Sequence, residues 1–173
     1  MPKERQFIPL NIALMTVSDS RDEASDRSGN LLREMAQEAG HRVAEKLIVP
    51  DNIYRIRAEV SRWIADPDLP VVITTGGTGL TGRDGSPEAV QPLLDKVIDG
   101  FGEMFRVLSY DSIGTSTLQS RCLGGVANGT YIFCLPGSSG ACRDGWTKLI
   151  SHQLDYRTRP CNLVELMPRL LES

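Results

Sequence analysis

Residues 71–89 read VVITTGGTGLTGRDGSPEA and place a strand, a glycine-rich loop and a helix start in direct succession. The apolar run Val71–Thr75 predicts a short buried strand. Four glycines lie in the seven residues after it. Ser86–Glu88 predicts a helix start with Ser86 as the N-cap, because a hydroxyl accepts from unpaired amides and proline suits the first helical position. A strand, a loop and a helix in this order are typical of an α/β fold.

The same alternation of short apolar strands and amphipathic helices extends over most of the chain. The expected strands span residues 11–18, 41–49, 71–75, 122–127 and 131–135, and the expected helices span about residues 29–39, 53–64, 86–98, 101–108 and 142–154, with a largely irregular tail from residue 157. Asn128-Gly129 predicts a hairpin between the last two strands. We therefore predict one α/β domain over residues 1–173, a three-layer αβα arrangement whose mostly parallel sheet has one antiparallel hairpin strand.

Composition limits the possible partners. The 173 residues are 40% hydrophobic and 24% charged, with a formal net charge of −3. Such a chain lacks the basic footprint of a protein that binds nucleic acid or an anionic membrane, so we expect neither partner. Pro9 and Asn11 interrupt the apolar stretch near the N-terminus, and no run approaches the roughly 18 apolar residues of a membrane span. The expected location is the cytoplasm.

Cysteine and histidine usage favours neither a zinc site nor a histidine-based catalytic triad. The four cysteines contain no C-x-x-C pair, and His41 and His152 are the only histidines. We expect reduced thiols that behave as small apolar groups. Neither histidine lies near a candidate nucleophile in the sequence, which leaves a Ser-His-Asp arrangement with little support.

The glycine loop matches two known phosphate-binding motifs incompletely. Gly77–Gly82 has the G-x-G-x-x-G spacing of dinucleotide-binding folds, but the predicted helix begins only at Ser86. The acid expected at a strand end about twenty residues later is also missing. The spacing of a P-loop is present too, but Arg83-Asp84 occupies the places of the required Lys and Ser/Thr. Neither type of site is therefore predicted.

Loops at the carboxyl ends of the predicted parallel strands form the candidate site. Ligands of parallel sheets bind beyond these ends, and glycines let backbone amides approach an anion closely. The loops that emerge there contain three carboxylates, those of Asp19, Asp51 and Asp84. Two carboxylates near a phosphate-binding backbone suit Mg²⁺, which prefers oxygen ligands shared with substrate phosphates.

Each of these carboxylates also has a purely structural interpretation. Asp51 stands where a helix N-cap is expected, Asp84 could be an ordinary turn residue, and Asp19 could be solvated. Considered singly, the structural interpretation is favoured for each; considered as a set at one edge of the sheet, a site is favoured. The amphipathic stretch Phe101–Leu108 is similarly either a core face or a subunit interface.

Together these motifs resemble the MoaB/MogA family of molybdenum cofactor biosynthesis proteins. The resemblance rests on TTGGTG followed by RDxxPEA, on VPD before a helix, on SDS at the end of the first strand and on LPGS at the end of the last. It covers about residues 8–154, and the stretches FGEMFRxLS and GTSTLQSR are most similar to the MoaB branch. The resemblance implies a three-layer α/β molybdopterin-binding fold and a homo-oligomer, either a trimer or a hexamer.

The activity that this resemblance implies is adenylylation of molybdopterin with Mg²⁺ and ATP, with release of pyrophosphate. Asp51 and Asp84 match the two aspartates that family members use for catalysis and metal binding. Ser120 and Arg121 match an element that would contact the terminal phosphate of the pterin. The other matching positions, implied to line the nucleotide and pterin sites, are Ser18, Asp19, Gly76, Gly77, Thr78, Gly79, Glu88, Pro136, Gly137 and Ser138.

A function of another class stays open, namely a pterin-binding oligomer that stores or hands on a cofactor intermediate without turnover. Gly85-Ser86 stands where many active family members carry Val-Thr, and the turn after the last strand reads PGSSG rather than PGxP. Both functions predict pterin binding. Only the enzyme predicts that Asp84→Asn removes turnover and leaves the fold intact.

Overall fold

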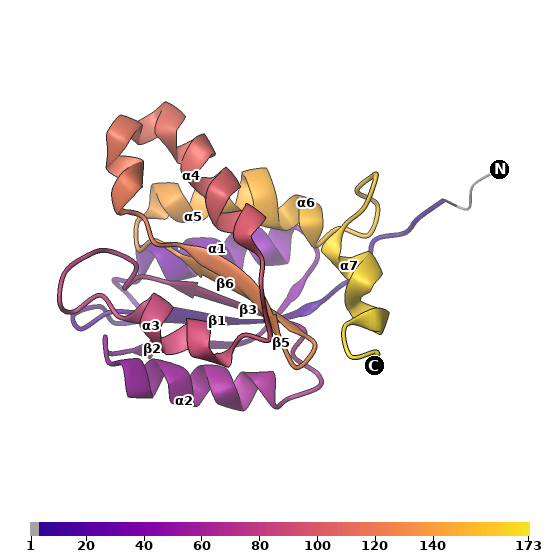
Figure 1. Ribbon diagram of the computed structural model, residues 1–173, viewed down its shortest axis with the longest axis horizontal. Helices are drawn as coiled ribbons and strands as arrows, with labels where there is room; N and C mark the ends of the chain where they lie inside the picture. Colours follow the sequence, from indigo (N-terminus) through magenta and orange to yellow (C-terminus); the bar gives the residue numbers. More distant parts are fainter. Residues whose placement is uncertain (1–3) are drawn as a thin grey trace.

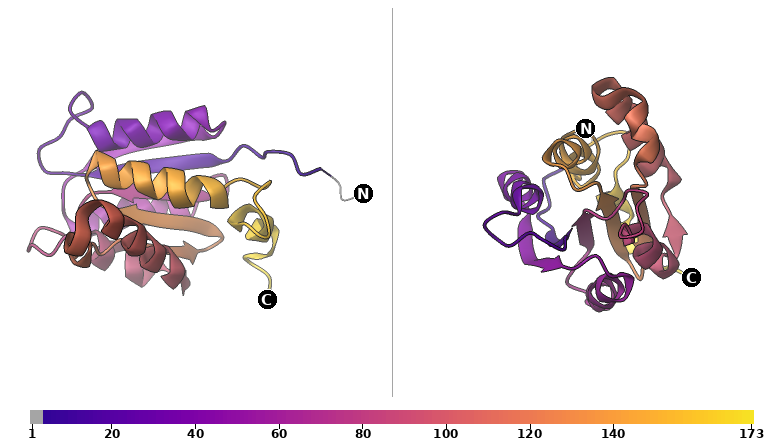
Figure 2. Two further views of the ribbon diagram at one scale, coloured as in Figure 1. Left: turned by 90° about the horizontal axis from the view of Figure 1, so that it is seen from above. Right: turned by 90° about the vertical axis from the view of Figure 1, so that its left-hand side faces the viewer.

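A computed structural model describes residues 4–173 and contains a six-stranded sheet between two layers of helices (Figures 1 and 2). The spatial order of the strands is β2-β1-β3-β6-β5-β4. Their bounds are Asn11–Val17 (β1), Arg42–Val49 (β2), Val71–Thr75 (β3), Lys96–Val97 (β4), Leu123–Ala127 (β5) and Thr130–Leu135 (β6). The strands β2, β1, β3 and β6 are parallel, whereas β5 runs antiparallel to both β6 and β4. The predicted α/β fold with a mostly parallel sheet is confirmed.

Side chains on the central strands alternate between two apolar clusters. On β1, Ile12 and Leu14 contribute to the cluster on one face, and Ala13 and Met15 contribute to the cluster on the other. Each of these side chains is buried. A parallel strand inside such a sheet needs apolar residues on both faces, which explains the continuous apolar runs in the sequence.

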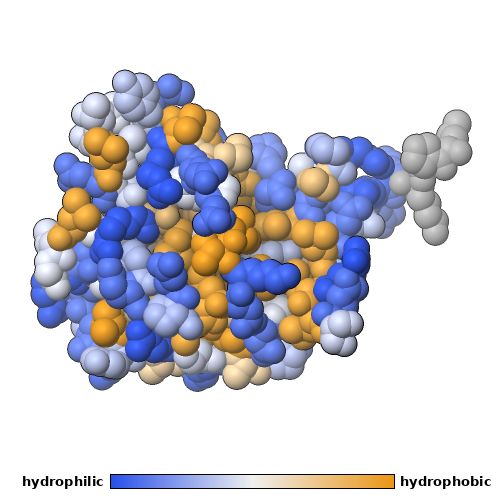
Figure 3. Space-filling view, viewed as in Figure 1, coloured by the Kyte–Doolittle hydropathy of each residue, from blue (hydrophilic) through white to orange (hydrophobic). Residues whose placement is uncertain are grey.

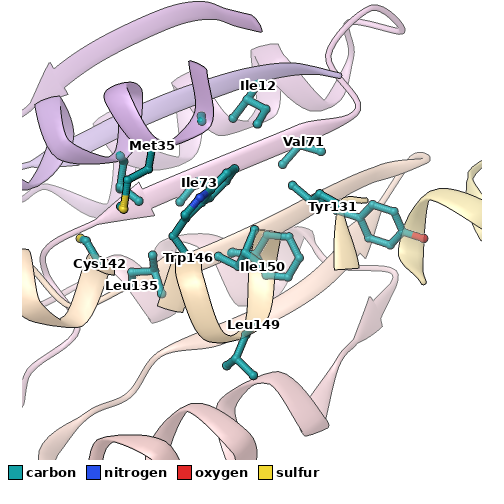
Figure 4. Packing of buried hydrophobic residues seen from close by; sticks show 14 of the residues in the cluster. Ile12, Met35, Val71, Ile73, Tyr131, Leu135, Cys142, Trp146, Leu149 and Ile150 are labelled. Carbon is teal, nitrogen blue, oxygen red and sulfur yellow. The ribbon is translucent and has the colours of Figure 1, made fainter. Parts of the chain in front are cut away.

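The helices divide between these two faces. The first cluster packs under α1 (Arg27–Glu38), α4 (Asp99–Ile113) and α5 (Ser139–Gly145), and Figure 4 shows Trp146, Leu149 and Ile150 packing against it from the turns that follow α5. The second packs against α2 (Ile53–Ile64) and α3 (Ser86–Val90). The segment after α5 consists of a π-helical stretch, Trp146–Ile150, and then α6 (Ser151–Gln153). None of the helices within residues 4–173 is long and apolar enough to cross a membrane.

The expected single helix over residues 86–98 is wrong. The α-helix α3 ends at Val90, a 3₁₀ turn spans Gln91–Leu93, and the short edge strand β4 precedes α4. Pro92 lacks the amide that an α-helix would need there, and the amide of Asp95 instead donates to the carbonyl of Val126 on β5 at 2.8 Å. The pairing with β5 therefore decides the local structure.

The helix cap at the start of α3 also differs from the prediction. Gly85 is the N-cap, and Ser86 lies at the first helical position. The hydroxyl of Ser86 donates to the carbonyl of Gly76 at 2.7 Å, and its amide donates to the carbonyl of Gly77 at 2.9 Å. Ser86 thus connects the helix to the glycine loop rather than capping the helix.

Two segments outside the expected strands and helices also have regular structure. The polar link after α4 forms a 3₁₀ helix, Gly114–Gln119. The tail contains α7 (Leu163–Leu166), which is capped by the side chain of Asn162, and then a 3₁₀ turn at Met167–Arg169. Val164 packs into the first apolar cluster, so long-range burial stabilises a helix that is too short to show periodicity.

Candidate functional site

The loops at the carboxyl ends of the parallel strands surround one cavity of about 700 Å³. These loops lie at the left-hand side of Figure 1, where the chain leaves β1 and β3. Most of the residues expected at the site line this cavity. Those that do are Ser18, Asp51, Gly76, Gly77, Thr78, Gly79, Asp84, Ser120, Pro136, Gly137 and Ser138. The fold thus collects residues from four strand-to-helix loops, and Ser120 from the segment before β5, at one place.

The glycine loop begins with two residues whose backbone favours glycine. Gly76 has φ of +100° and Gly77 has φ of +69°. A Cβ atom at Gly76 would lie 2.4 Å from the carbonyl oxygen of Val17, and one at Gly77 would lie 2.5 Å from Oγ of Ser86. The amide of Gly76 donates to the carbonyl of Leu135 at 3.0 Å, so that amide is already used within the fold. The loop is therefore held closely against the ends of β1 and β6.

Asp51 lies between β2 and α2 and does not cap the helix. Asn52 is the N-cap of α2, and its side chain accepts from the amides of Tyr54 and Arg55. The structural interpretation of Asp51 as a cap is therefore wrong. Its Oδ1 atom is buried without a hydrogen-bond partner among the described residues. Burial raises the pKa of the Asp51 carboxyl, and the nearby charges of Asp84 and Asp19 add to this effect, whereas the neighbouring backbone amide of Gly85 and the charge of Arg83 partly oppose it.

Asp84 lies on the glycine loop itself and is held by that loop. Its Oδ2 atom accepts from the amide of Thr81 at 2.9 Å and from the hydroxyl of Thr81 at 2.7 Å. These hydrogen bonds lower the pKa of the Asp84 carboxyl. A Cβ atom at Gly79 would lie 2.7 Å from Oδ2, so the carboxylate closely approaches the glycine backbone. Asp84 is therefore ionised and fixed in position at neutral pH.

Asp19 lies at the rim, outside the lining of the cavity. Its Oδ1 atom accepts from the amide of Asp51 at 3.0 Å, and its Oδ2 atom lies 2.7 Å from the guanidinium of Arg83. The hydrogen bond from Arg83 lowers the pKa of the Asp19 carboxyl. Both side chains are exposed. Asp19 thus joins the loop after β1 to the loops that carry Asp51 and Asp84.

Arg121 and Glu88 lie behind the glycine loop and line a neighbouring cavity of about 830 Å³. The guanidinium of Arg121 donates to the carbonyl of Gly79 at 2.8 Å and to the carbonyl of Asp84 at 3.2 Å, and it forms an ion pair with Glu88. Ser120 lines both cavities, and its Oγ atom is buried without a hydrogen-bond partner among the described residues. Arg121 thus holds the glycine loop through two of its nitrogens and α3 through the third.

Ser18 and the turn after β6 line the cavity while they also hold their own loops. The Ser18 hydroxyl accepts from the amide of Arg21 at 3.0 Å, and Ser138 caps α5 by accepting from the amide of Ala141. A Cβ atom at Gly137 would lie 3.3 Å from Cα of Gly76. This close approach brings the turn after β6 against the glycine loop.

Several cavity residues were not predicted from the sequence. Arg21 follows β1 in a polar loop, whereas Phe105, Ser109 and Ile113 come from α4, and Gln119 comes from the 3₁₀ helix that follows. The charge of Arg21 and its place three residues after Ser18 are visible in the sequence and could have suggested it. The residues on α4 had no such signal, because their position depends on how α4 packs over the sheet.

Comparisons with known proteins identify the family. The family profile described as "Probable molybdopterin binding domain" matches residues 13–156. Molybdenum cofactor biosynthesis protein B of Escherichia coli (strain K12) is 59% identical over 157 residues, which are 91% of this chain and 92% of that protein. Its counterpart in Bacillus cereus is 47% identical over 146 residues, or 84% of this chain and 86% of that protein.

The structural comparison gives the same result. A crystal structure of a molybdenum cofactor biosynthesis protein B has a TM-score of 0.84 and 44% sequence identity to this chain, and the match covers 87% of this chain and 94% of that chain. The resemblance noted from the motifs is therefore confirmed, and the chain belongs to the MoaB/MogA family of molybdopterin-binding domains.

Proposed function

We propose that this protein acts in molybdenum cofactor biosynthesis by adenylylating molybdopterin with ATP and releasing pyrophosphate. The observation that carries the proposal is the position of Asp51 and Asp84, which come from different loops and line the same cavity as the glycine loop. The family relationship supports the pterin as the ligand, and the names of the relatives place those proteins in molybdenum cofactor biosynthesis. The nucleotide and the transfer step are inferred from the chemistry of the cavity.

The residues at the cavity fit a magnesium ion that is shared with the substrate. Asp51 has a buried Oδ1 atom without a hydrogen-bond partner within residues 4–173, and a bound cation would relieve the cost of leaving it unpaired. Residues 4–173 bring together no group of three or more His, Cys, Asp or Glu side chains that could hold a metal alone. A site of two carboxylates suits Mg²⁺, which takes its other ligands from water and substrate phosphates. Bound between Asp51 and Asp84, Mg²⁺ would offset negative charge on the departing pyrophosphate.

The residues of the chain then contribute position and charge rather than a covalent intermediate. The glycine loop would hold the nucleotide phosphates close to the backbone, since no side chain of Gly77 or Gly79 intervenes. An oxygen of the pterin phosphate would attack the α-phosphorus of ATP, so that one P–O bond forms as the bond to pyrophosphate breaks. Holding both groups in one cavity removes much of the entropic cost of this encounter.

The second candidate is the pterin-binding oligomer without turnover. It shares its oligomeric state with the enzyme, and the apolar surface of α4 and the following 3₁₀ helix bears on that state alone, since Met104, Val107, Tyr110, Ile113 and Leu118 are each more than half exposed. Figure 3 shows apolar side chains reaching the surface in this part of the molecule. A surface of this kind favours a homo-oligomer, trimeric or hexameric, for either function. Sedimentation equilibrium measures the number of subunits.

Product formation by the wild-type protein and by Asp84→Asn distinguishes adenylylation from pterin binding without turnover. The wild-type protein, incubated with molybdopterin, Mg²⁺ and ATP, is expected to form adenylylated pterin and pyrophosphate in equal amounts. Asp84→Asn removes the charge but keeps the shape, and we expect the rate to fall by at least about a hundredfold. Asp68→Asn, at an exposed aspartate remote from the cavity, is the matched control and should keep the wild-type rate. If wild-type protein binds pterin but yields no product, the non-catalytic function is the correct one.

A further inference from the structure

One cationic side chain, that of Arg21, lines the cavity apart from the two carboxylates that suit Mg²⁺. Among the described residues that line it, the charged side chains are those of Asp51, Asp84 and Arg21. Both substrates of the proposed reaction carry phosphate. The carboxylates of Asp51 and Asp84 repel a phosphate group unless a cation lies between carboxylate and phosphate. Within the described part of the chain, Arg21 is therefore the one lining side chain whose charge attracts a phosphate group directly.

Buried polar groups hold Arg21 by one of its nitrogens. Its Nη1 atom donates to the hydroxyl of Ser28 at 2.8 Å and to the carbonyl of Gly137 at 3.4 Å, and it lies 3.9 Å from Oδ1 of Asp26. Ser28 and Asp26 are completely buried. The Arg21 side chain itself is 37% exposed. The structure shows no partner within residues 4–173 for its Nε and Nη2 donors, so these are available to a ligand.

Asp26 is in turn fixed by groups from three elements. Its side chain caps α1 by accepting from the amide of Gly29 at 3.0 Å, and it accepts from the hydroxyl of Thr16 on β1 at 2.7 Å and from the ammonium of Lys46 on β2 at 2.8 Å. The buried carboxylate that lies next to Arg21 is therefore itself held in a fixed position. A guanidinium that is positioned before the ligand arrives loses less conformational freedom on binding.

Two other arginines lie at the glycine loop. Arg83 donates to Asp19 through Nε and Nη2, and each of the three guanidinium nitrogens of Arg121 already has a protein partner. The Nε and Nη2 atoms of Arg121 donate to the carbonyls of Gly79 and Asp84, and its Nη1 atom pairs with Glu88. A phosphate at Arg121 would share nitrogens with these contacts, whereas Nε and Nη2 of Arg21 have no partner within residues 4–173. This difference in free donors distinguishes the two guanidinium groups.

We propose that Arg21 binds a phosphate group of a substrate, on the side of the cavity formed by the loops after β1 and β6. The two carboxylates lie on the loops after β2 and β3, so this arrangement separates a phosphate anchor from the metal-binding side. The proposal deepens the proposed function, on which it rests for the identity of the ligands. The phosphate belongs either to the pterin or to the nucleotide, and the experiment below distinguishes these sources.

Paired ligands with and without phosphate provide the test. Binding is measured for molybdopterin and its dephosphorylated form, and for ADP and adenosine, with wild-type protein and with Arg21→Gln. Losing a charge-assisted hydrogen bond is expected to weaken binding of the relevant phosphorylated ligand by about 10- to 100-fold. Binding of the dephosphorylated partner should stay unchanged. Arg21→Lys keeps the charge without the fork geometry and should show a smaller loss.

A merely structural role for Arg21, as a tie between Ser28 and Gly137, would give a different result. Arg21→Gln would then weaken phosphorylated and dephosphorylated ligands equally, and that outcome overturns the proposal. Unchanged binding of all four ligands overturns it as well. Arg27→Gln is the matched control, since Arg27 is exposed on the same segment and does not line the cavity. These measurements record binding alone, so they stand apart from the turnover test of the proposed function.

Discussion

Asp26 and Asp51 follow two neighbouring parallel strands, yet their surroundings are opposite. Asp26 lies at the end of the loop after β1, is fully buried, and receives hydrogen bonds from Thr16, Gly29 and Lys46. Asp51 follows β2 and keeps a buried oxygen without any partner among the described residues. The first carboxylate is satisfied by the fold, whereas the second is left for something outside the fold.

The pKa values of the two carboxyls shift in opposite directions for this reason. Burial opposes ionisation of Asp26, but the hydrogen bonds from Lys46, Thr16 and Gly29 outweigh burial and leave its pKa lowered. Burial also acts on Asp51, where no cation compensates fully, and its pKa is raised. Ionised Asp26 therefore stabilises the fold, and ionised Asp51 destabilises it. Such a contrast is typical of a functional carboxylate beside a structural one.

Asp26→Asn is expected to cause the largest loss of stability. It leaves the ammonium of Lys46, whose side chain is 7% exposed, without its buried partner. We expect the free energy of unfolding to fall by about 3 kcal/mol at pH 7, at the lower end of the range for broken buried pairs because Glu23 still contacts Lys46. Urea denaturation measures the change. The control is Glu23→Gln, which removes an exposed partner and should cost less than about 1 kcal/mol.

The free energy of unfolding at acidic pH gives a second test of the role of Asp26. Since the folded pKa of Asp26 is lowered, its contribution is present above its unfolded pKa near 3.8 and is lost as the pH falls through the folded pKa. Wild-type protein and Asp26→Asn should therefore converge in stability at strongly acidic pH. A constant difference between them down to that pH would contradict the assignment.

Substitutions at Gly29 and Gly77 test how tightly the chain packs around Asp26 and Asp51. A Cβ atom at Gly29 would lie 2.2 Å from Oδ2 of Asp26, and one at Gly77 would lie 3.2 Å from Oδ2 of Asp51. Alanine normally stabilises a helix relative to glycine by about 1 kcal/mol, but Gly29→Ala should reverse that sign and cost roughly 1–3 kcal/mol. Gly77→Ala should cost about 1–2 kcal/mol through its positive φ and weaken nucleotide binding about tenfold. Thermal unfolding and calorimetric titration measure these effects, and a stabilising Gly29→Ala would refute this packing.

Among these substitutions, Asp51→Asn should change the free energy of unfolding least, and it should raise that free energy rather than lower it. Removing a partly buried charge that keeps one buried oxygen unpaired among the described residues is expected to raise the free energy of unfolding by roughly 0.5–2 kcal/mol at pH 7 while turnover is lost. Because the folded pKa of Asp51 is raised, the destabilisation is complete above that pKa and is relieved as the pH falls through it. The gain should therefore shrink between pH 7 and pH 4. A variant less stable than wild type at pH 7 would show that Asp51 is structurally required.

The sequence predicts the general architecture well because the relevant signals are local. Strand Val71–Thr75 has the bounds that its apolar run predicts, and the helix Ile53–Ile64 follows its helical spacing. The expected helix over residues 86–98 fails because β4 is only two residues long and exists through its pairing with β5. Residues far apart in the chain decide that pairing, so periodicity within one window cannot reveal it.

The sequence by itself determined which loops meet, since alternating strands and helices place the loops after parallel strands at one edge. It also determined that the glycine loop can approach a ligand closely, because only glycine readily adopts the backbone of Gly76 and Gly77. The tertiary structure alone decided which polar groups are used up within the fold. Each guanidinium nitrogen of Arg121 contacts a carbonyl of the glycine loop or the Glu88 carboxylate, whereas Arg21 and Asp51 keep atoms without protein partners among the described residues. That distinction depends on burial and on contacts between distant segments, and no short stretch of sequence contains it.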